Sequence, residues 1–423
     1  MSNNFDSNIT RQLARIFLEK FEAVRVLSKN VNTQLLVGRF DPASGADVDF
    51  KRPTDYTASR NSTGDATGIA DSIITGKATG TVQKYFTVMV NFDEADEAIK
   101  MDQLDQLLAP MATRIVTNLE LDFAQFMMHN SALIAGTVGT AVTTWPHVAE
   151  ASAVMQSAGV PMDDRWSYAM NPFTMTTLAD VQRSLGSGGT SGDLVKSAHE
   201  RAVITENFAG MRVLTSTSLA SFTTPAVADL AGAINGAPDV TYVTAKDTMT
   251  QSVIFDAFGT FTGTILAGTV IEFTGINRLN LSTRQAVVDG AGANVLWTGT
   301  VTADATITSG AVTLILTGPA IFETGGAYNT TAAALLDNTV ATILNADSTL
   351  FQPNLFWHKQ AFSIGSVPIK KLFSTDTLAT TEDGLQLRVS KFSDGLTNVQ
   401  SVRFDLRPAY AVLNPFFSGQ GWG

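Results

Sequence analysis

Four histidines, the side chains best suited to acid–base catalysis or to zinc binding, stand far apart in this sequence. They are His129, His147, His199 and His358. His199-Glu200 begins the His-Glu-x-x-His pattern of zinc proteases, but Val203 stands where the second histidine is needed. No two histidines have the spacing of metal ligands on one element. The sequence therefore predicts neither a metal site nor a catalytic histidine.

Glycine-rich segments and acidic pairs are the next candidates for chemistry. Residues 186–192 lack the lysine of a phosphate-binding loop, and a helical pattern precedes them instead of a strand. Gly76-Lys77 is followed by Ala78 where serine or threonine is required. The pairs Asp93-Glu94 and Asp163-Asp164 are typical of helix starts and turns. We predict no enzyme and no cofactor, since a hydrolase would need a histidine, an acid and a nucleophile that converge from separate segments.

The composition favours a protein whose surface becomes interface. The chain has 423 residues, of which 44% are hydrophobic and only 16% are charged. Typical soluble domains contain roughly 25% charged residues. Charged residues are depleted at the centres of interfaces, so a surface poor in charge is expected where protein meets protein.

Charge and cysteine usage exclude several other classes. The net charge is −11 and the basic residues form no stripe, so tight binding of nucleic acid is not expected. The chain has no cysteine, which excludes disulfides and thiolate chemistry. The sequence contains no apolar run of about 18 residues and no basic, apolar leader. We expect a protein without a membrane helix that folds in a cytoplasm.

Three helices are predicted in the first third of the chain. Residues Ile9–Leu27 carry apolar side chains at helical spacing, which indicates an amphipathic helix. A second apolar stripe runs from Leu104 to about His129. Because proline interrupts a helix, we predict a short helix with Asp93-Glu94 in its first turn, followed by a long helix that starts near Pro110.

Between the first and the second of these predicted helices, the sequence becomes poor in large apolar residues. Residues 38–84 combine turn formers, such as Asp41-Pro42 and Asn61-Ser62, with few large apolar side chains. A stretch of this length cannot bury a core of its own. We predict either disorder or an extended arm that rests on a neighbouring subunit.

Three short segments follow, each of which ends or begins at a residue typical of turns. A helix pattern over Ala149–Ser157 ends at Gly159-Val160-Pro161, where glycine is a typical helix C-cap. The strand pattern Trp166–Met170 stops at Asn171-Pro172, after which another helix is predicted. Gly210 then opens a further strand. These residues shape turns and carry no chemistry of their own.

Residues 223–350 have the pattern of a small closed β-barrel, with short alternating strands between glycine-rich turns. The predicted strands are Val253–Phe255, Phe258–Leu266, Val270–Phe273, Val295–Val301, Ala305–Ile307 and Val312–Leu316. Only Lys246, Arg278 and Arg284 are basic in this stretch.

The order of these segments resembles tailed-phage major capsid proteins, whose fold is shared with the Hong Kong phage and herpesvirus capsids. Ala267–Gly275 is similar to the insertion phrase of the short-tailed lambdoid phage coat proteins, and Ala361–Ile369 resembles the same proteins. The ending Tyr410–Pro415 is similar to the way in which capsid proteins of this fold finish. The resemblance implies an α+β fold with an N-terminal arm, an extended loop, a long spine helix, peripheral and axial domains, and an inserted all-β barrel domain.

The same resemblance implies how the chain is divided. The parts are an N-terminal arm helix (1–37), an extended β-hairpin loop (38–92), a capsid core with the spine helix and the axial and peripheral parts (93–222), an inserted β-barrel domain (223–350) and the C-terminal core strands (351–423). The extended loop is expected over a neighbour within the capsomer, and the barrel on the outer face. We predict that Asp239, Lys246 and Asp247, near the start of the barrel segment, contact the next capsomer.

The resemblance also implies a function and partners. Copies of the chain would form hexamers and pentamers in an icosahedral shell that encloses the double-stranded DNA of a tailed phage without sequence-specific binding. Assembly would take place in the bacterial host cytoplasm, with a scaffolding protein and a portal protein. An acidic lining would leave the genome loosely held. The alternative is another virion structural protein, such as a tail-tube or fibre subunit, which the threonine- and glycine-rich β segment fits but the long helix does not.

Overall fold

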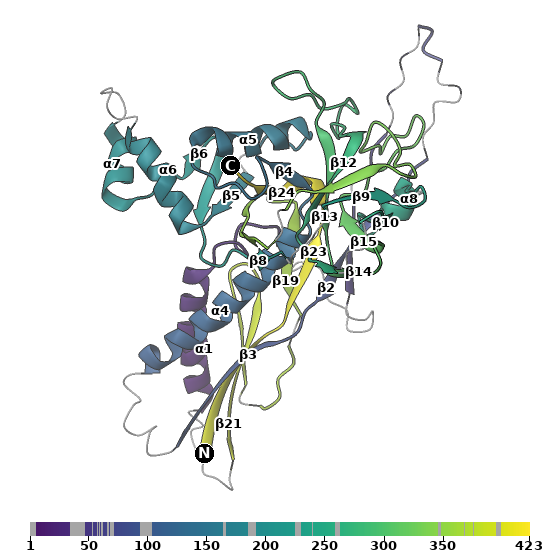
Figure 1. The fold of residues 1–423 in the computed structure, drawn as a ribbon. Coiled ribbons are helices and arrows are strands. Elements are labelled where there is room, and N and C mark those ends of the chain that lie inside the picture. Colours follow the sequence, from purple (N-terminus) through teal and green to yellow (C-terminus); the bar gives the residue numbers. More distant parts are fainter. Residues whose placement is uncertain are drawn as a thin grey trace. The chain divides into compact units, whose positions relative to one another are not determined.

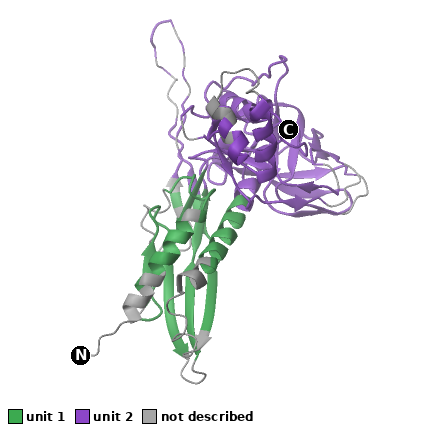
Figure 2. Cartoon of the chain, turned by 90° about the vertical axis from the view of Figure 1, so that its left-hand side faces the viewer, with its two compact units in different colours: residues 1–49, 79–124, 362–411 green, residues 50–78, 125–361, 412–423 purple. Residues whose placement is uncertain are grey.

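The computed structural model has an α+β architecture (Figure 1). The residues that it describes are 6–33, 47–93, 104–163, 166–184, 192–224, 230–258, 263–345, 348–394 and 399–423, without 53, 57, 59, 61, 66, 68–71, 239, 368 and 375. The chain forms two compact units, coloured separately in Figure 2. Unit 1 comprises residues 1–49, 79–124 and 362–411, and unit 2 comprises residues 50–78, 125–361 and 412–423. None of the described helices is long and apolar enough to cross a membrane.

Unit 1 contains an antiparallel sheet that packs against helix α1. Its strands follow the order β20 (Thr377–Thr380), β21 (Gln386–Asp394), β22 (Val399–Leu406) and β3 (Phe86–Asp93). Helix α1 (Asp6–Val24) contacts β20 and β21, and the ring of Phe17 stacks on Phe404 with 4.3 Å between centroids. The helix predicted at Ile9–Leu27 is therefore present but is shifted toward the N-terminus. It ends at Val24, which was predicted on the apolar face and is 39% exposed.

A second sheet of unit 1 has four strands. Their order is β1 (Asp47–Lys51), β2 (Lys77–Val82), β23 (Pro408–Val412) and β19 (Phe362–Ser366). Thr81 of β2 pairs with Tyr410 of β23, and the Tyr410 ring packs on Phe123 with 5.1 Å between centroids. Strands β1 and β2 are neighbours in this sheet, and the residues that connect them belong to unit 2.

Helix α4 (Leu104–His129) is the predicted long helix, but the predicted break near Pro110 is wrong. Pro110 lies inside one continuous helix that begins at Leu104. Pro110 lies near the start of the helix, where it removes a single main-chain hydrogen bond. Its ring is exposed, so the helix continues through it. Asp93, predicted in the first turn of a helix, is the last residue of β3. Residues 94–103, where the short helix was predicted, lie outside the described residues.

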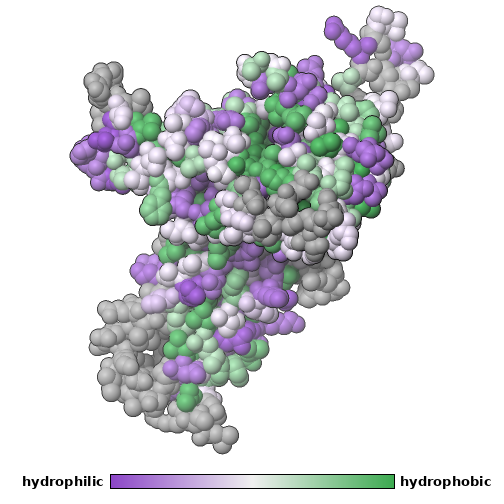
Figure 3. Space-filling view, in the orientation of Figure 1, coloured by the Kyte–Doolittle hydropathy of each residue, from purple (hydrophilic) through white to green (hydrophobic). Residues whose placement is uncertain are grey.

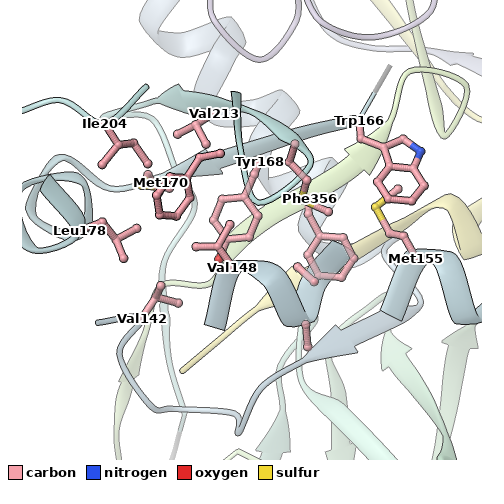
Figure 4. Packing of buried hydrophobic residues seen from close by; sticks show 14 of the residues in the cluster. Val142, Val148, Met155, Trp166, Tyr168, Met170, Leu178, Ile204, Val213 and Phe356 are labelled. Carbon is pink, nitrogen blue, oxygen red and sulfur yellow. The ribbon is translucent and has the colours of Figure 1, made fainter. Parts of the chain in front are cut away.

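Unit 2 contains a six-stranded sheet with helices packed on it. The strand order is β4 (Leu133–Ala135), β24 (Ser418–Gly421), β18 (Asn354–His358), β5 (Trp166–Met170), β7 (Met211–Thr215) and β6 (Asn207–Phe208). The helices are α5 (Trp145–Ser157), α6 (Pro172–Ser184) and α7 (Gly192–Arg201). In their shared core, Met155 points toward Trp166, and Tyr168 is stacked with Phe356 (Figure 4).

Glycine and asparagine form the turns of unit 2 that the sequence predicted. Gly159 follows α5 with a φ of 85°, and hydrogen bonds from the N–H groups of Gly159 and Val160 close a Schellman C-cap. The side-chain oxygen of Asn171 accepts the N–H of Phe173 at 2.9 Å and so caps α6. Gly210, with a φ of 79°, precedes β7. Strand β5 has the predicted bounds.

Unit 2 also contains a closed six-stranded barrel. Its order is β10 (Thr250–Asp256), β15 (Val312–Thr317), β13 (Leu296–Val301), β12 (Val270–Asn277), β16 (Val340–Ile343) and β9 (Ala231–Ile234). Phe273 and Trp297 pack in its core with 5.0 Å between ring centroids. Strands β9 and β16 were not among the predicted strands.

Two further strand pairs of unit 2 lie outside the barrel. The strands predicted at 258–266 and 305–307 form a separate ribbon of β11 (Gly263–Ile265) and β14 (Ala305–Ile307). Strand β8 (Phe222–Thr223) pairs with β17 (Leu350–Phe351), so the chain enters and leaves the barrel region at one place.

Candidate functional site

The residues that suggested chemistry in the sequence have ordinary structural surroundings. Among the described residues, no group of three or more His, Asp or Glu side chains is placed to hold a metal ion. His199 lies in α7 and is exposed. His358 is buried, with Nε2 at 2.9 Å from the Oδ1 of Asp163, while its Nδ1 accepts the N–H of Gln360 at 3.1 Å. Residues 185–191 and Asp164 lie outside the described residues.

Two of the three residues predicted as inter-capsomer contacts are described. Lys246 and Asp247 follow the short helix α8 (Tyr242–Ala245), whereas Asp239 lies outside the described residues. The Nζ of Lys246 lies 3.5 Å from both the carbonyl oxygen of Thr75 and the Oδ2 of Asp247. The Oδ1 of Asp247 accepts the N–H of Lys77 at 3.0 Å. Both residues therefore contact their own chain, and their contact with another capsomer stays a prediction.

The segment that they contact is the loop base, defined as two segments, residues 50–52 with 54–56 and residues 72–78. Three connections of the barrel meet it. Strands β9, β12 and β15 run in the same direction, because each is antiparallel to β10 or to β16. The connections that follow these three strands consequently leave the same end of the barrel. They carry Asp247, Arg284 and Tyr328, which we call the anchor residues.

Tyr328 contacts both sides of the loop base with one hydroxyl group. Its Oη accepts the N–H of Asp55 at 3.0 Å and donates to the carbonyl oxygen of Ile74 at 3.3 Å. The ring of Tyr328 is stacked face to face on Tyr242, with 3.6 Å between centroids and 3° between planes. The stacked partner fixes the ring and thereby the position of the hydroxyl group. Burial raises the pKa of Tyr242, and the neighbouring Tyr328 adds to this rise.

Arg284 and Arg52 form charged contacts at the same place. The guanidinium of Arg284 donates to the carboxylate of Asp55 at 2.5 Å and to the carbonyl oxygen of Asn329 at 2.8 Å. Arg52, in the loop base, donates to the carbonyl oxygens of Lys77 at 3.2 Å, of Leu413, and of Val412 at 3.1 Å.

The environment of Arg52 perturbs its titration. Burial lowers the pKa of Arg52 to about 10, while the charge of Asp247 opposes this shift. A pKa of about 10 leaves the guanidinium charged at neutral pH, so its contacts to three main-chain carbonyl groups are charge-assisted hydrogen bonds. A cavity of about 310 Å³ lies beside these contacts, lined by loop-base and anchor residues together with Phe416 and Phe417.

Comparison with known proteins gives the family. The family model described as P22 coat protein, gene protein 5, matches residues 1–422. This chain belongs to the P22 coat protein family. A major capsid protein of Acyrthosiphon pisum secondary endosymbiont phage 1 is 37% identical over 429 residues, with 100% of both chains covered. As a member of this family, the chain is a phage major capsid protein and a component of the virion.

Two solved structures of low sequence identity are also similar. One from Mycobacterium phage Che8 is 14% identical, with a TM-score of 0.45 and coverage of 93% of this chain and 90% of that chain. The capsid structure of cyanophage P-SCSP1u is 11% identical, with a TM-score of 0.43 and coverage of 89% and 83%. The family match decides against the alternative of a tail-tube or fibre subunit.

Sequence reasoning missed most of the coat protein's loop-base contacts. Arg52, Asp55, Arg284 and Tyr328 were not predicted as a group, because they are distant in sequence and follow no motif. One signal was present: the barrel segment has three basic residues only, and two of them, Lys246 and Arg284, contact the loop base. The third, Arg278, is buried and donates to Thr298 at 2.7 Å.

Proposed function

We propose that copies of this coat protein close into an icosahedral shell of hexamers and pentamers around the double-stranded DNA genome of a tailed phage. The observation that carries this proposal is the match of residues 1–422, nearly the whole chain, to the P22 coat protein family. The DNA is enclosed without sequence-specific binding, since a net charge of −11 without a basic stripe does not favour tight phosphate contacts.

Exposed apolar side chains support a role in assembly. Phe173, Met162, Ile73 and Leu350 are 83%, 75%, 74% and 68% exposed in the single chain. Figure 3 shows hydrophobic residues interspersed with hydrophilic ones over one face of the molecule. Burial of these side chains between copies of the chain would remove apolar surface from water and so favour association. Obligate interfaces bury roughly 2,000–5,000 Å², which offsets the cost of association.

We further propose the partners and the place of assembly. A scaffolding protein guides the coat protein in the cytoplasm of the bacterial host, and a portal protein occupies one vertex. The protein acts by binding and not by catalysis. The absence of cysteine from the chain is compatible with assembly in a reducing compartment.

The extended loop and the barrel are the proposed contacts between copies. The described residues in the middle of the loop, 58, 60, 62–65 and 67, are all exposed within the chain. An exposed segment with no core of its own gains burial when it lies over a neighbour in the capsomer. The barrel lies on the outer face of the shell, where Asp239, Lys246 and Asp247 contact the next capsomer.

Expression of the protein with the scaffolding protein of its phage, and separately without it, tests the proposed function. Sedimentation and negative-stain electron microscopy are expected to show closed shells when both proteins are present. A monodisperse small oligomer under both conditions would contradict the proposal.

A further inference from the structure

Two of the anchor residues, Tyr328 and Asp247, contact both segments of the loop base, whereas Arg284 contacts only Asp55 of the first segment. Tyr328 takes a hydrogen bond from Asp55 on one side and gives one to Ile74 on the other. Asp247 accepts the N–H of Lys77 with its carboxylate, and its main-chain oxygen lies 3.5 Å from the guanidinium of Arg52. Each of these anchor residues therefore holds both sides at once.

The loop base also approaches the barrel closely through its main chain. Gly76 is buried, and the N–H of the next residue, Lys77, donates a hydrogen bond to the carboxylate of Asp247. A Cβ atom at position 76 would lie 2.5 Å from the carbonyl oxygen of Lys246 and 3.1 Å from its Cβ. Real Cβ atoms do not approach main-chain oxygen so closely, and only glycine permits this distance.

We propose that Asp247, Arg284 and Tyr328 are positioning residues that fix the direction in which the loop base leaves the barrel, so that the loop meets a second copy of this chain in a set register. This inference rests on the proposed function, because it assumes that the loop contacts a neighbouring subunit. The loop-base contacts themselves lie within one chain and can be measured on the unassembled protein.

The physical reason for such an anchor is the weakness of an isolated ribbon. A two-stranded ribbon without further support is marginally stable in water. A mobile loop would lose its conformational freedom when it binds a neighbour, and that loss weakens association. Hydrogen bonds that Tyr328 and Asp247 accept from the loop base, together with the ion pair of Arg284 with Asp55, remove this freedom before assembly begins.

Tyr328→Phe is the sharpest test, because it removes one oxygen atom and keeps the ring on Tyr242. We expect amide hydrogen exchange at the loop base of the full-length, unassembled protein to become about threefold to tenfold faster. The matched control is Tyr56→Phe, which removes a hydroxyl group from an exposed tyrosine of the same segment. Exchange in Tyr56→Phe should equal that of the wild type.

Gly76→Ala tests the close approach independently. The added methyl group displaces the loop base from Lys246, so exchange in residues 72–78 should rise by about tenfold. Gly290→Ala is its control, because a Cβ atom at position 290 meets nothing within 4 Å. Exchange in the barrel strands should remain at the wild-type level in all four variants, which shows that the barrel stays folded.

Assembly at equal concentrations of folded protein distinguishes positioning from general stability. With the phage's scaffolding protein, Tyr328→Phe and Gly76→Ala are expected to give more open or misformed particles than their controls, as counted by electron microscopy. Wild-type exchange at the loop base in both variants would overturn the proposal. Faster exchange with normal shells would also overturn it, because the loop direction would then be irrelevant. If the wild type itself formed no shells, the proposed function would fail instead.

Discussion

The carboxylate of Glu120 in α4 holds the main chain at Ser28, in the turn that follows α1. Its Oε1 accepts both the N–H of Ser28, at 3.0 Å, and the hydroxyl group of Ser28, and its Oε2 accepts the N–H of Leu27 at 2.6 Å. Glu120 is 2% exposed. A buried carboxylate is tolerated there because three donors surround it, and the contact joins the N-terminal segment to the long helix of unit 1.

We expect Glu120→Gln to lower the free energy of unfolding by about 2 kcal/mol. Glutamine keeps one acceptor oxygen but turns an amide NH₂ group toward a second donor, so one buried N–H loses its partner. Unfolding in urea, followed by circular dichroism, measures the change. The exposed Glu19 of α1 provides the control Glu19→Gln, which should change the free energy by less than about 0.5 kcal/mol. Equal stabilities of the two variants would contradict the role of Glu120.

His129, the last residue of α4, should make stability depend on pH. Burial lowers the pKa of His129 below its usual value of 6.5, and the charge of Asp304 opposes this shift only in part. The folded protein thus binds the proton more weakly than the unfolded chain, and wild-type stability falls as pH drops through 6.5 and below.

His129→Gln removes this titration. Relative to the wild type, the free energy of unfolding of this variant should therefore increase as the pH is lowered from about 7.5 to about 5.5, which means that the variant gains relative stability. Urea unfolding at several pH values measures the difference. The exposed His199 supplies the control variant His199→Gln. A difference between His129→Gln and the wild type that does not vary with pH would show that the prediction is wrong.

Gly419, in the final strand β24, should not tolerate a side chain. A Cβ atom there would overlap the ring of Phe356 and lie 2.6 Å from the carbonyl oxygen of Leu133, in strands on either side. Neither neighbour can move without disturbing the sheet, so Gly419→Ala should cost about 1–3 kcal/mol of unfolding free energy. Chemical unfolding measures this cost against Gly290→Ala, which places a methyl group in open space. A cost within about 0.5 kcal/mol would contradict the packing argument.

The parts of unit 2 that could be predicted are those whose ends are marked by residues that stop a strand or cap a helix. Strand β5 has the predicted bounds because Asn171-Pro172 stops the strand and the Asn171 side chain caps the next helix. Gly159 was identifiable as a C-cap because its residue type permits a positive φ. By contrast, Pro110 misled the prediction of where the long helix starts. Proline breaks a helix where the lost hydrogen bond and the clash of its ring with the preceding turn are not tolerated, and near the start of α4 both are tolerated.

The loop-base contacts could not have been predicted from local sequence. Asp55, Asp247, Arg284 and Tyr328 come together because three connections leave one end of the barrel. That arrangement depends on strand order and direction. Strand β9 and strand β24 (Ala-Gly-Ala-Ile and Ser-Gly-Gln-Gly) were missed because their small residues carry little of the β-branched pattern that identifies strands.

Phe173, near the start of α6, should contribute to assembly and not to folding. It is 83% exposed in the single chain, so Phe173→Ser should change the free energy of unfolding by less than about 0.5 kcal/mol. Burial of a phenylalanine side chain in an interface contributes about 2 kcal/mol per copy, and its loss should reduce the yield of closed shells. Thr176→Ala, which changes another exposed side chain of the same helix, is the control. Normal shell yield from Phe173→Ser would place Phe173 outside the interfaces.

Lys246→Asp tests the proposed contact with the next capsomer. The change places a second carboxylate beside Asp247 and reverses the charge of a side chain that lies near the loop base. If Lys246 also contacts another capsomer, the variant should fold and form shells that break at lower temperature or lower denaturant concentration than those of Lys359→Asp, the same change at an exposed lysine. Hydrogen exchange of residues 72–78 in the unassembled chain shows whether a loss arises at the loop base instead. Unaltered assembly and unaltered shell stability would remove Lys246 from the inter-capsomer contact.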